Sequence, residues 1–190
     1  MTQLCLVRHG ETCWNVEGRW QGHSDAPLDE NGINQARKVA EELAPRHFTA
    51  IYSSDLQRAR ITAEAIAKIQ ELPVIIDPRL RELNMGAWEG LLFSDIPTLY
   101  PEGWAEHQRW PVEFLYPNGE SVQQLARRIV PAIASICAEY PADAQILIVS
   151  HGLSLAVFLC HVHGWPLDEA FTRIPRNATP VFLDWVPKPA

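Results

Sequence analysis

Two short segments of this chain place a histidine and a glycine directly after an apolar run. The first reads Leu-Val-Arg-His-Gly at residues 6–10, and the second reads Leu-Ile-Val-Ser-His-Gly at residues 147–152. An imidazole in such a position can attack an electrophile or hydrogen-bond an anion. Sites in open α/β sheets gather at the carboxyl ends of strands, so we expect His9 and His151 to meet in one site. Two separate polar residues at unrelated strand ends are the alternative, which the repeated pattern disfavours.

The residues around His9 suit a phosphoryl group. Arg8 supplies a planar cationic donor, and Thr12 and Asn15 supply neutral hydrogen-bond donors. Gly10 tolerates backbone conformations that bulkier residues resist, so we expect a sharp turn around the anion there. This stretch therefore predicts an anion site at the end of an amino-terminal strand.

A second arginine is predicted at the same edge of the sheet. Residues 53–58 read Ser-Ser-Asp-Leu-Gln-Arg and join a short strand to a helix. Arg58 would lie in the first turn of that helix, where free backbone amides and the helix dipole also favour an anion. Arg60 does not share that face of the helix and is expected to be a solvated surface residue.

Glu82 is the candidate acid of the site. It stands among apolar residues in Arg-Glu-Leu-Asn-Met-Gly at residues 81–86. Desolvation there would keep a carboxyl group protonated, as a general acid must be. An ion pair with Arg79 or Arg81 is the alternative role, and the sequence leaves the two open.

The order and spacing of these segments resemble the histidine phosphatase superfamily, in its phosphoglycerate mutase-like branch. The resemblance covers nearly the whole chain and includes Asn-Gly-Glu-Ser at residues 118–121. It implies that His9 is the nucleophile that becomes phosphohistidine, and that Glu82 is the proton donor. The implied catalytic set is completed by Arg8, Arg58 and His151. Substrate-binding residues are expected at Thr12, Asn15, Gln21, Gly22 and Gly152.

The physical chemistry of these groups agrees with that role. Attack on phosphorus requires a neutral imidazole, and the nearby arginines disfavour protonation of His9. The arginines also neutralise the phosphoryl oxygens during in-line transfer, so we expect neither a metal nor a cofactor. Glu82 would protonate the departing alkoxide and then accept a proton from the attacking water. His161 and His163 stand two apart at a helix end and cannot share a face, so no metal site is expected there.

The acceptor of the phosphoryl group is water in one part of the family and a glycerate in the mutases. Residues 91–120 contain one strong base, Arg109, among five acidic residues. This balance would repel a substrate that carries both a phosphate and a carboxylate. We therefore predict a phosphatase of a small phosphorylated metabolite. A cofactor-dependent phosphoglycerate mutase and a phosphate-binding regulatory protein are the alternatives.

Length and composition predict one domain over residues 1–190, with an inserted lid at about 91–119. The aromatic residues of that insertion either contact the leaving group or form a hydrophobic cluster beneath a loop. The formal net charge of −7 disfavours nucleic acid and anionic membranes as partners, and a homodimer is compatible with the sequence. Four cysteines without a CxxC pair and the lack of a signal peptide predict a cytoplasmic protein with reduced thiols.

Alternating strand and helix patterns predict an α/β fold: a three-layer α/β/α sandwich with a mainly parallel sheet and helices on both faces. Asp29 and Asp55 are expected to cap two of the helices. The second of these helices should turn Ile61, Ile66 and Ile69 inward. The strands are predicted at 4–7, 50–53, 73–76, 145–149 and 179–185, and the main helices at 29–45, 55–70, 121–140 and 153–163.

Overall fold

A single mixed sheet forms the centre of the computed structural model, which describes residues 1–185. Its strand order is β3-β2-β4-β1-β5, and only the edge strand β5 runs antiparallel to its neighbour. The mainly parallel sheet that the sequence predicts is therefore confirmed. The strands are β1 (Thr2–Arg8), β2 (Ala50–Ser53), β3 (Val74–Ile76), β4 (Gln145–Ser150) and β5 (Pro180–Trp185).

Strands β1 and β4 lie at the middle of the sheet and are buried on both faces, which explains their nearly continuous apolar sequences. They pair in register, with Val7 opposite Val149 and Arg8 opposite Ser150. The backbone nitrogen of His9 donates to the carbonyl of Ser150 at 3.0 Å. The residues that follow the two strands therefore emerge side by side.

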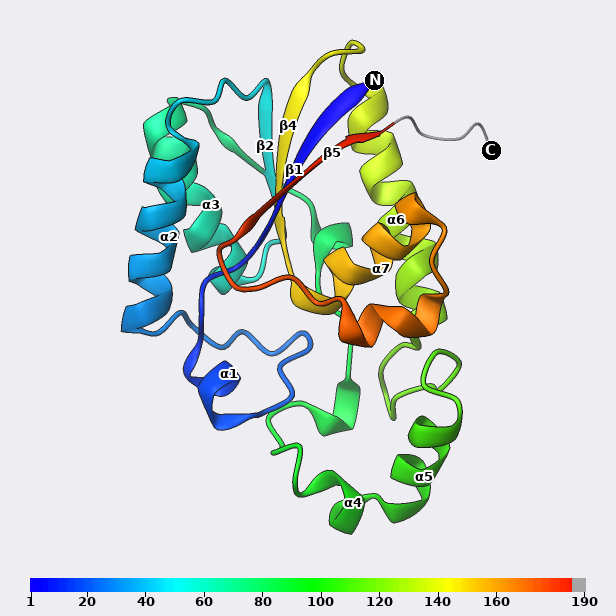
Figure 1. The fold of residues 1–190 in the computed structure, drawn as a ribbon. Helices are drawn as coiled ribbons and strands as arrows, with labels where there is room; N and C mark the ends of the chain where they lie inside the picture. The colour runs from blue at the N-terminus through cyan, green and yellow to red at the C-terminus, as the bar shows by residue number, and fades with distance from the viewer. Residues whose placement is uncertain (186–190) are drawn as a thin grey trace.

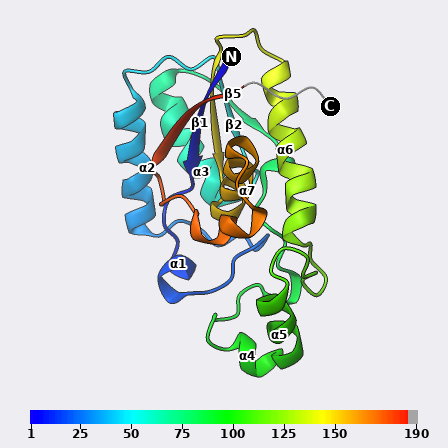
Figure 2. The same ribbon diagram turned by 45° about the vertical axis from the view of Figure 1, so that its right-hand side comes forward.

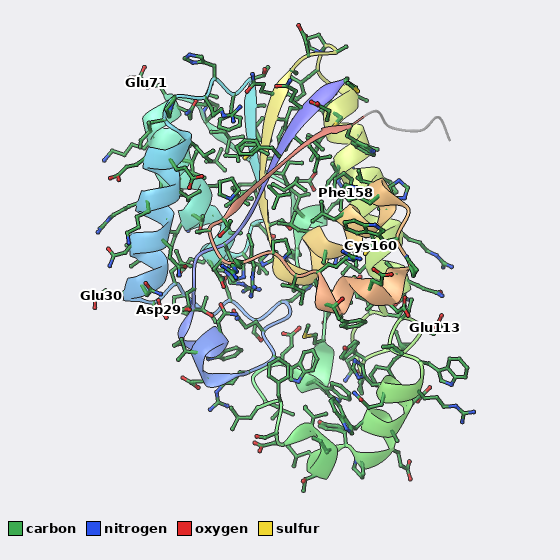
Figure 3. All side chains as sticks on the ribbon, in the orientation of Figure 1. Asp29, Glu30, Glu71, Glu113, Phe158 and Cys160 are labelled. Carbon is green, nitrogen blue, oxygen red and sulfur yellow. The ribbon has the colours of Figure 1, made fainter. Side chains whose placement is uncertain are left out.

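Helices α2 (Glu30–Leu43) and α3 (Gln57–Gln70) cover one face of the sheet, on the left in Figure 1. The carboxylate of Asp29 caps α2 by accepting the Gly32 amide at 2.7 Å, as predicted. Asp29 and Glu30 mark the lower end of α2 in Figure 3, the end at which the carboxyl ends of β1 and β4 also lie.

Helices α6 (Val122–Ala138) and α7 (Gly152–His163) cover the opposite face, so the molecule has the three predicted layers (Figure 2). Ser121 and Gln124 form a capping box at the start of α6, and Pro131 lies within that helix. Phe158 of α7 packs edge-on against Trp185 of β5, with ring centroids 4.9 Å apart.

Two details of α3 differ from the prediction. Asp55 does not cap the helix, because its carboxylate accepts two hydrogen bonds from Arg81 at 2.8 and 2.6 Å. Ile69 is 43% exposed, and Ile66 is the only one of the three predicted isoleucines that is buried. Small residues occupy most of the buried stripe, which lets α3 approach the sheet and α2 closely. After Arg58, which the functional site uses, that stripe consists of Ala59, Thr62, Ala63, Ile66 and Ala67.

Segment 91–119 lies beyond the carboxyl ends of the strands and contains α4 (Ile96–Leu99) and α5 (Pro101–Arg109) (Figure 1). Its aromatic side chains surround Trp88, whose ring lies 5.2 Å from that of Phe114 and 5.0 Å from that of Tyr116. Of the two roles that the sequence leaves open for these aromatic residues, most of them therefore take the second, a hydrophobic cluster beneath a loop.

The remaining elements are short. They are the helix α1 (Cys13–Glu17) and the 3-10 helices η1 (Pro78–Leu80), η2 (Gly86–Trp88) and η3 (Leu167–Thr172). No helix within residues 1–185 combines the length and apolar character needed to cross a membrane.

Candidate active site

His9 and His151 lie together where β1 and β4 end, with ring centroids 5.2 Å apart. His9 is 3% exposed, and the Nδ1 atom of its ring lies 2.7 Å from the carbonyl oxygen of Gly10. A carbonyl oxygen can only accept, so Nδ1 carries the proton and Nε2 keeps its lone pair. The backbone thus fixes the tautomer that a nucleophile needs.

The electrostatic surroundings keep both rings neutral. Burial lowers the pKa of His9 well below its ordinary value, and the positive charges of Arg58 and Arg8 lower it further. The pKa of His151 is lowered in the same way, by burial first and then by Arg58. Two neutral imidazoles can therefore face an anion together with two cations.

His151 is completely buried at the N-cap position of α7. Its Nε2 is hydrogen-bonded to the hydroxyl of Ser54 at 2.9 Å, while its Nδ1 has no partner among the described residues. Buried polar atoms are nearly always paired in folded proteins, so an orphaned ring nitrogen is unusual. His151 is not among the residues that line the cavity described below, so its contact with a phosphoryl oxygen stays a prediction.

Arg58 lies in the first turn of α3, as predicted, and is almost wholly buried. Its terminal nitrogens donate to the carbonyls of Ser24 at 2.7 Å and Gly22 at 2.8 Å. Burial lowers the pKa of Arg58 to about 10, which still leaves the guanidinium charged at neutral pH. Arg8 is held similarly, by the carbonyl of Pro175 at 3.1 Å. The Nε of each arginine has no partner within residues 1–185, so each retains a donor for an anion.

Thr62 joins the nucleophile segment to the arginine helix, and sequence reasoning missed it. Its hydroxyl accepts the Gly10 amide at 3.0 Å and donates to the Arg58 carbonyl at 2.8 Å. The one signal in the sequence is that Thr62 interrupts the otherwise apolar buried stripe of α3. This hydroxyl fixes the relative positions of His9 and Arg58.

The reason for a glycine at position 10 differs from the prediction. Gly10 does not adopt a left-handed conformation. A Cβ at this position would instead collide with the backbone of Gly32 in the first turn of α2. Close approach of two backbone segments, not a sharp turn, requires the glycine.

Glu82 is buried, lines the cavity and accepts four hydrogen bonds. The Leu83 amide donates to Oε1 at 2.9 Å, and the Leu153 amide donates to Oε2 at 3.1 Å. The amide and the hydroxyl of Ser154 both donate to Oε1, at 3.0 and 3.1 Å. Oε2 accepts one of these bonds and Oε1 accepts three, so Oε2 has the greater remaining capacity for a hydrogen bond.

The alternative role for Glu82, an ion pair with a neighbouring arginine, does not occur. Arg79 pairs with Asp77 at 2.7 Å, and Arg81 pairs with Asp55 at 2.6 Å. Both arginines are therefore directed to other carboxylates.

Glu89 organises the loop that carries Gln21 and Gly22, and the sequence analysis did not identify it. Its carboxylate accepts the amides of His23 and Ser24, each at 2.8 Å, and the amide of Met85 at 3.1 Å. Gly22 has a φ of 52° and lies against this carboxylate, which leaves no room for a side chain. Glu89 and Arg58 thus hold the loop from opposite sides. The only signal in the sequence is a glutamate between Trp88 and a glycine.

Thr12 and Asn15 are bound to each other. The hydroxyl of Thr12 accepts the Asn15 amide at 3.2 Å, and Asn15 Oδ1 accepts the Thr12 amide at 3.1 Å, which forms a capping box for α1. Asn15 lines the cavity, but the fully buried Thr12 does not. The Thr12 hydroxyl caps the helix that presents Asn15, and its predicted contact with substrate stays a prediction.

One cavity of about 260 Å³ brings the remaining predicted residues together. Gly152 borders it at the start of α7, where a side chain would collide with Ile174 and press against Arg8. Gln21 lines it with a side-chain oxygen that has no partner in the described chain. The polar wall consists of Arg8, His9, Asn15, Arg19, Gln21, Gly22, Arg58, Glu82 and Gly152.

Metal-ligating side chains are not clustered in the described part of the chain. Within residues 1–185, no group of three or more His, Cys, Asp or Glu side chains is placed to hold a metal ion. His163, one of the two histidines at the end of α7, stacks on Trp165 with ring centroids 4.2 Å apart.

An α/β protein with paired imidazoles and guanidinium groups at the carboxyl ends of its central strands belongs to the class that handles phosphoryl groups. The sequence matches the histidine phosphatase superfamily (branch 1) over residues 4–188. The chain is a member of that family.

Relatives with different names are similar to this chain in sequence or in fold. The chain is 40% identical over 196 residues to "Probable phosphoglycerate mutase GpmB" of Yersinia pestis (strain Pestoides F), covering 100% of this chain and 87% of the relative. The alpha-ribazole phosphatase of Shigella flexneri superposes with a TM-score of 0.89 at 31% identity, covering 96% and 90% of the two chains. A mycobacterial glucosyl-3-phosphoglycerate phosphatase, solved with VO3, superposes with a TM-score of 0.84 at 32% identity. The match covers 96% of this chain and 90% of that chain.

Proposed function

We propose that this protein hydrolyses small phosphomonoesters through a phosphohistidine formed on His9, without a metal ion. The observation that carries the proposal is the state of the His9 ring. Its Nδ1 is committed to the Gly10 carbonyl, its pKa is lowered by burial and two cations, and its Nε2 faces the cavity with a free lone pair. Binding alone would not require an imidazole prepared in this way.

In the first step, Nε2 of His9 attacks phosphorus, and the bond from phosphorus to the alcohol oxygen breaks. Glu82 gives its proton to the departing oxygen, so the product leaves as a neutral alcohol. Arg8, Arg58 and Nδ1 of His151 hold the three remaining phosphoryl oxygens while their charge shifts.

In the second step, a water molecule attacks phosphorus and the bond from phosphorus to Nε2 breaks. Glu82, now ionised, accepts the proton of that water and returns to its initial state. Inorganic phosphate leaves, and the His9 ring is again neutral. The cycle consumes one water and releases one alcohol and one phosphate.

The charges of the cavity favour water over a phosphoglycerate as the acceptor. Besides Arg8 and Arg58, the described cavity wall contains one cation, Arg19. Arg19 already contacts Glu17 at 2.5 Å and donates to the carbonyl of Gly90 at 2.8 Å. A substrate carboxylate would have to compete for a guanidinium that is already paired. Phosphoglycerate mutase activity is the second candidate, because a relative at 40% identity bears that name.

The test combines turnover with trapping of the intermediate. Phosphate release from simple monoesters should greatly exceed the interconversion of phosphoglycerates, and a chelator should leave the rate unchanged. Acid quenching with radiolabelled phenyl phosphate should leave label on the protein. His9→Ala should abolish both label and turnover, whereas His161→Ala, at an exposed histidine of α7, should preserve them. Label that persists in His9→Ala would refute the proposal.

A further inference from the structure

Six large apolar side chains line the active-site cavity together with its polar residues. They come from five parts of the chain: the loop after α1, the segment around η2, the stretch before α4, the start of α7 and the segment around η3. We call this surface the apolar wall, and it consists of Trp20, Met85, Phe93, Leu153, Phe171 and Ile174.

The centre of the apolar wall is rigid. The rings of Trp20 and Phe93 meet edge to face with centroids 4.5 Å apart. The Trp20 ring also packs against the buried rings of Trp88 and Tyr116, with ring centroids 6.0 and 6.1 Å apart. Backbone hydrogen bonds hold both residues. The Trp20 amide donates to the Leu91 carbonyl at 3.0 Å, and the Phe93 amide donates to the Gly18 carbonyl at 2.9 Å. The surface is therefore formed before any ligand binds, which lowers the entropic cost of binding.

The mouth of the cavity leaves large apolar side chains in water. Phe93 is 50% exposed and Ile174 is 41% exposed, and both border the cavity. Contiguous exposed apolar surface at the rim of a pocket is typical of a ligand-binding site. A ligand that covers these two side chains would gain the free energy of burying them.

The polar and apolar parts of the cavity match the two ends of one kind of substrate. The phosphoryl group is expected among His9, Arg8 and Arg58, so the leaving group extends along the rest of the cavity. The cavity has a volume of about 260 Å³. An apolar cavity of roughly 150 Å³ can hold benzene, so this volume admits a ring beside the phosphoryl group.

We propose, on the basis of the phosphatase function above, that the preferred substrates are phosphomonoesters whose alcohol carries a bulky apolar group such as an aromatic ring. The ring lies on the apolar wall, between Trp20, Phe93 and Phe171. Small polyhydroxylated or carboxylated alcohols are poor substrates, because their polar groups would lose water against this surface without gaining partners.

Two esters with equally reactive leaving groups test this preference. Ethyl phosphate and 2-phenylethyl phosphate both release a primary alkanol, so a difference in kcat/KM reports binding of the ring and not leaving-group acidity. We expect 2-phenylethyl phosphate to be favoured by at least about tenfold, the lower end of the range for one apolar group in a fitted pocket. Equal values, or a preference for glycerol phosphate, would overturn the proposal.

Variants locate the preference on the apolar wall. Phe93→Ala should reduce the ratio of the two kcat/KM values by about 3–10-fold, the contribution of a specific aromatic contact. Trp110→Ala is the matched control, since Trp110 is 53% exposed in the same segment but lies outside the cavity wall. It should leave the ratio unchanged. An equal ratio in the wild type and Phe93→Ala would contradict the role of this wall.

Calorimetric titration with phosphonates separates this inference from the proposed function. 2-Phenylethylphosphonate and ethylphosphonate cannot transfer their phosphorus, so their affinities compare the two side chains without turnover. The aromatic phosphonate should bind at least about tenfold more tightly. Retention of this preference in a protein that forms no phosphoenzyme would overturn the proposed function alone. Loss of the preference in a protein that does form phosphoenzyme would overturn the substrate class alone.

Discussion

Ser154 donates two hydrogen bonds to one oxygen of Glu82, from its backbone nitrogen at 3.0 Å and from its hydroxyl at 3.1 Å. These bonds make Glu82 the cap of α7, because the N-cap residue His151 makes no capping hydrogen bond with its own side chain. The helix that His151, a proposed phosphate ligand, precedes thus also positions the proposed acid. The single proton of this hydroxyl is shared with the carbonyl of Arg81 at 2.8 Å, which ties the acid's backbone to the helix.

Removing the Ser154 hydroxyl should impair protonation of the leaving group. Ser154→Ala keeps the backbone donor and loses the side-chain donor, so Glu82 should lose its fixed orientation. We expect kcat for an alkyl phosphate to fall by about 2–10-fold, the value of one hydrogen bond to a neutral group. The loss should be smaller for p-nitrophenyl phosphate, because nitrophenolate departs without a proton.

Steady-state kinetics on both esters distinguish this effect from general damage. Ser135→Ala is the matched control, since the Ser135 hydroxyl only bonds the Ala132 carbonyl within α6 at 2.8 Å. Equal losses on both esters in Ser154→Ala would mean that Ser154 has a structural role only.

Arg58 should set the acidic limit of activity. Burial and the charges of Arg58 and Arg8 lower the pKa of His9. The ring therefore stays neutral and nucleophilic when the pH falls below the ordinary pKa of a histidine. Arg58→Gln removes one of these charges and raises the pKa of His9 toward the ordinary value. The acidic limb of kcat/KM against pH should therefore move to higher pH, together with a roughly 10²–10³-fold loss of kcat from one lost clamp. An acidic limb that stays in place would refute this electrostatic link.

Stability should also fall in acid. His9 and His151 have lowered pKa values in the folded protein, so they remain neutral while the unfolded chain takes up protons below about pH 6.5. The unfolded state then binds more protons, and the free energy of unfolding decreases as the pH falls through that value. Each ring contributes up to about 1.4 kcal/mol per pH unit. Urea denaturation between pH 7 and pH 5 should show this slope, and His9→Asn should make it shallower.

The positions of His9 and His151 follow from local sequence, which explains why they could be predicted. Each follows a short apolar run that is typical of a buried strand, and parallel strands bring their carboxyl ends to one edge. The place of Arg58 in the first helical turn is likewise a local property. The mainly parallel sheet and the three layers follow from the alternation of elements, and the structure confirms them, whereas the strand order was not predicted.

Contacts between distant segments could not be predicted in the same way. Asp55 has the sequence of a helix cap, but Arg81 lies close enough to take its carboxylate. Glu89 and Thr62 have unremarkable local sequences, and their importance comes from amides supplied by other loops. The buried side of α3 is set by close packing of small residues, which a search for large apolar residues does not detect.

Two glycines at equivalent helical positions should respond to alanine in opposite ways. Gly32 and Gly103 are each the third residue of a helix, α2 and α5, where alanine is ordinarily favoured by about 1 kcal/mol. At Gly103 an added Cβ would meet its nearest neighbour, in Trp88, at 3.6 Å, so Gly103→Ala should stabilise the protein by up to about 1 kcal/mol. At Gly32 a Cβ would collide with the backbone of Glu11, beside the nucleophile segment. Gly32→Ala should therefore destabilise the protein by about 1–3 kcal/mol and displace His9, with a loss of kcat. Urea denaturation and turnover of both variants measure the contrast, and full activity in Gly32→Ala would show that the close approach to the Gly10 segment is not needed for catalysis.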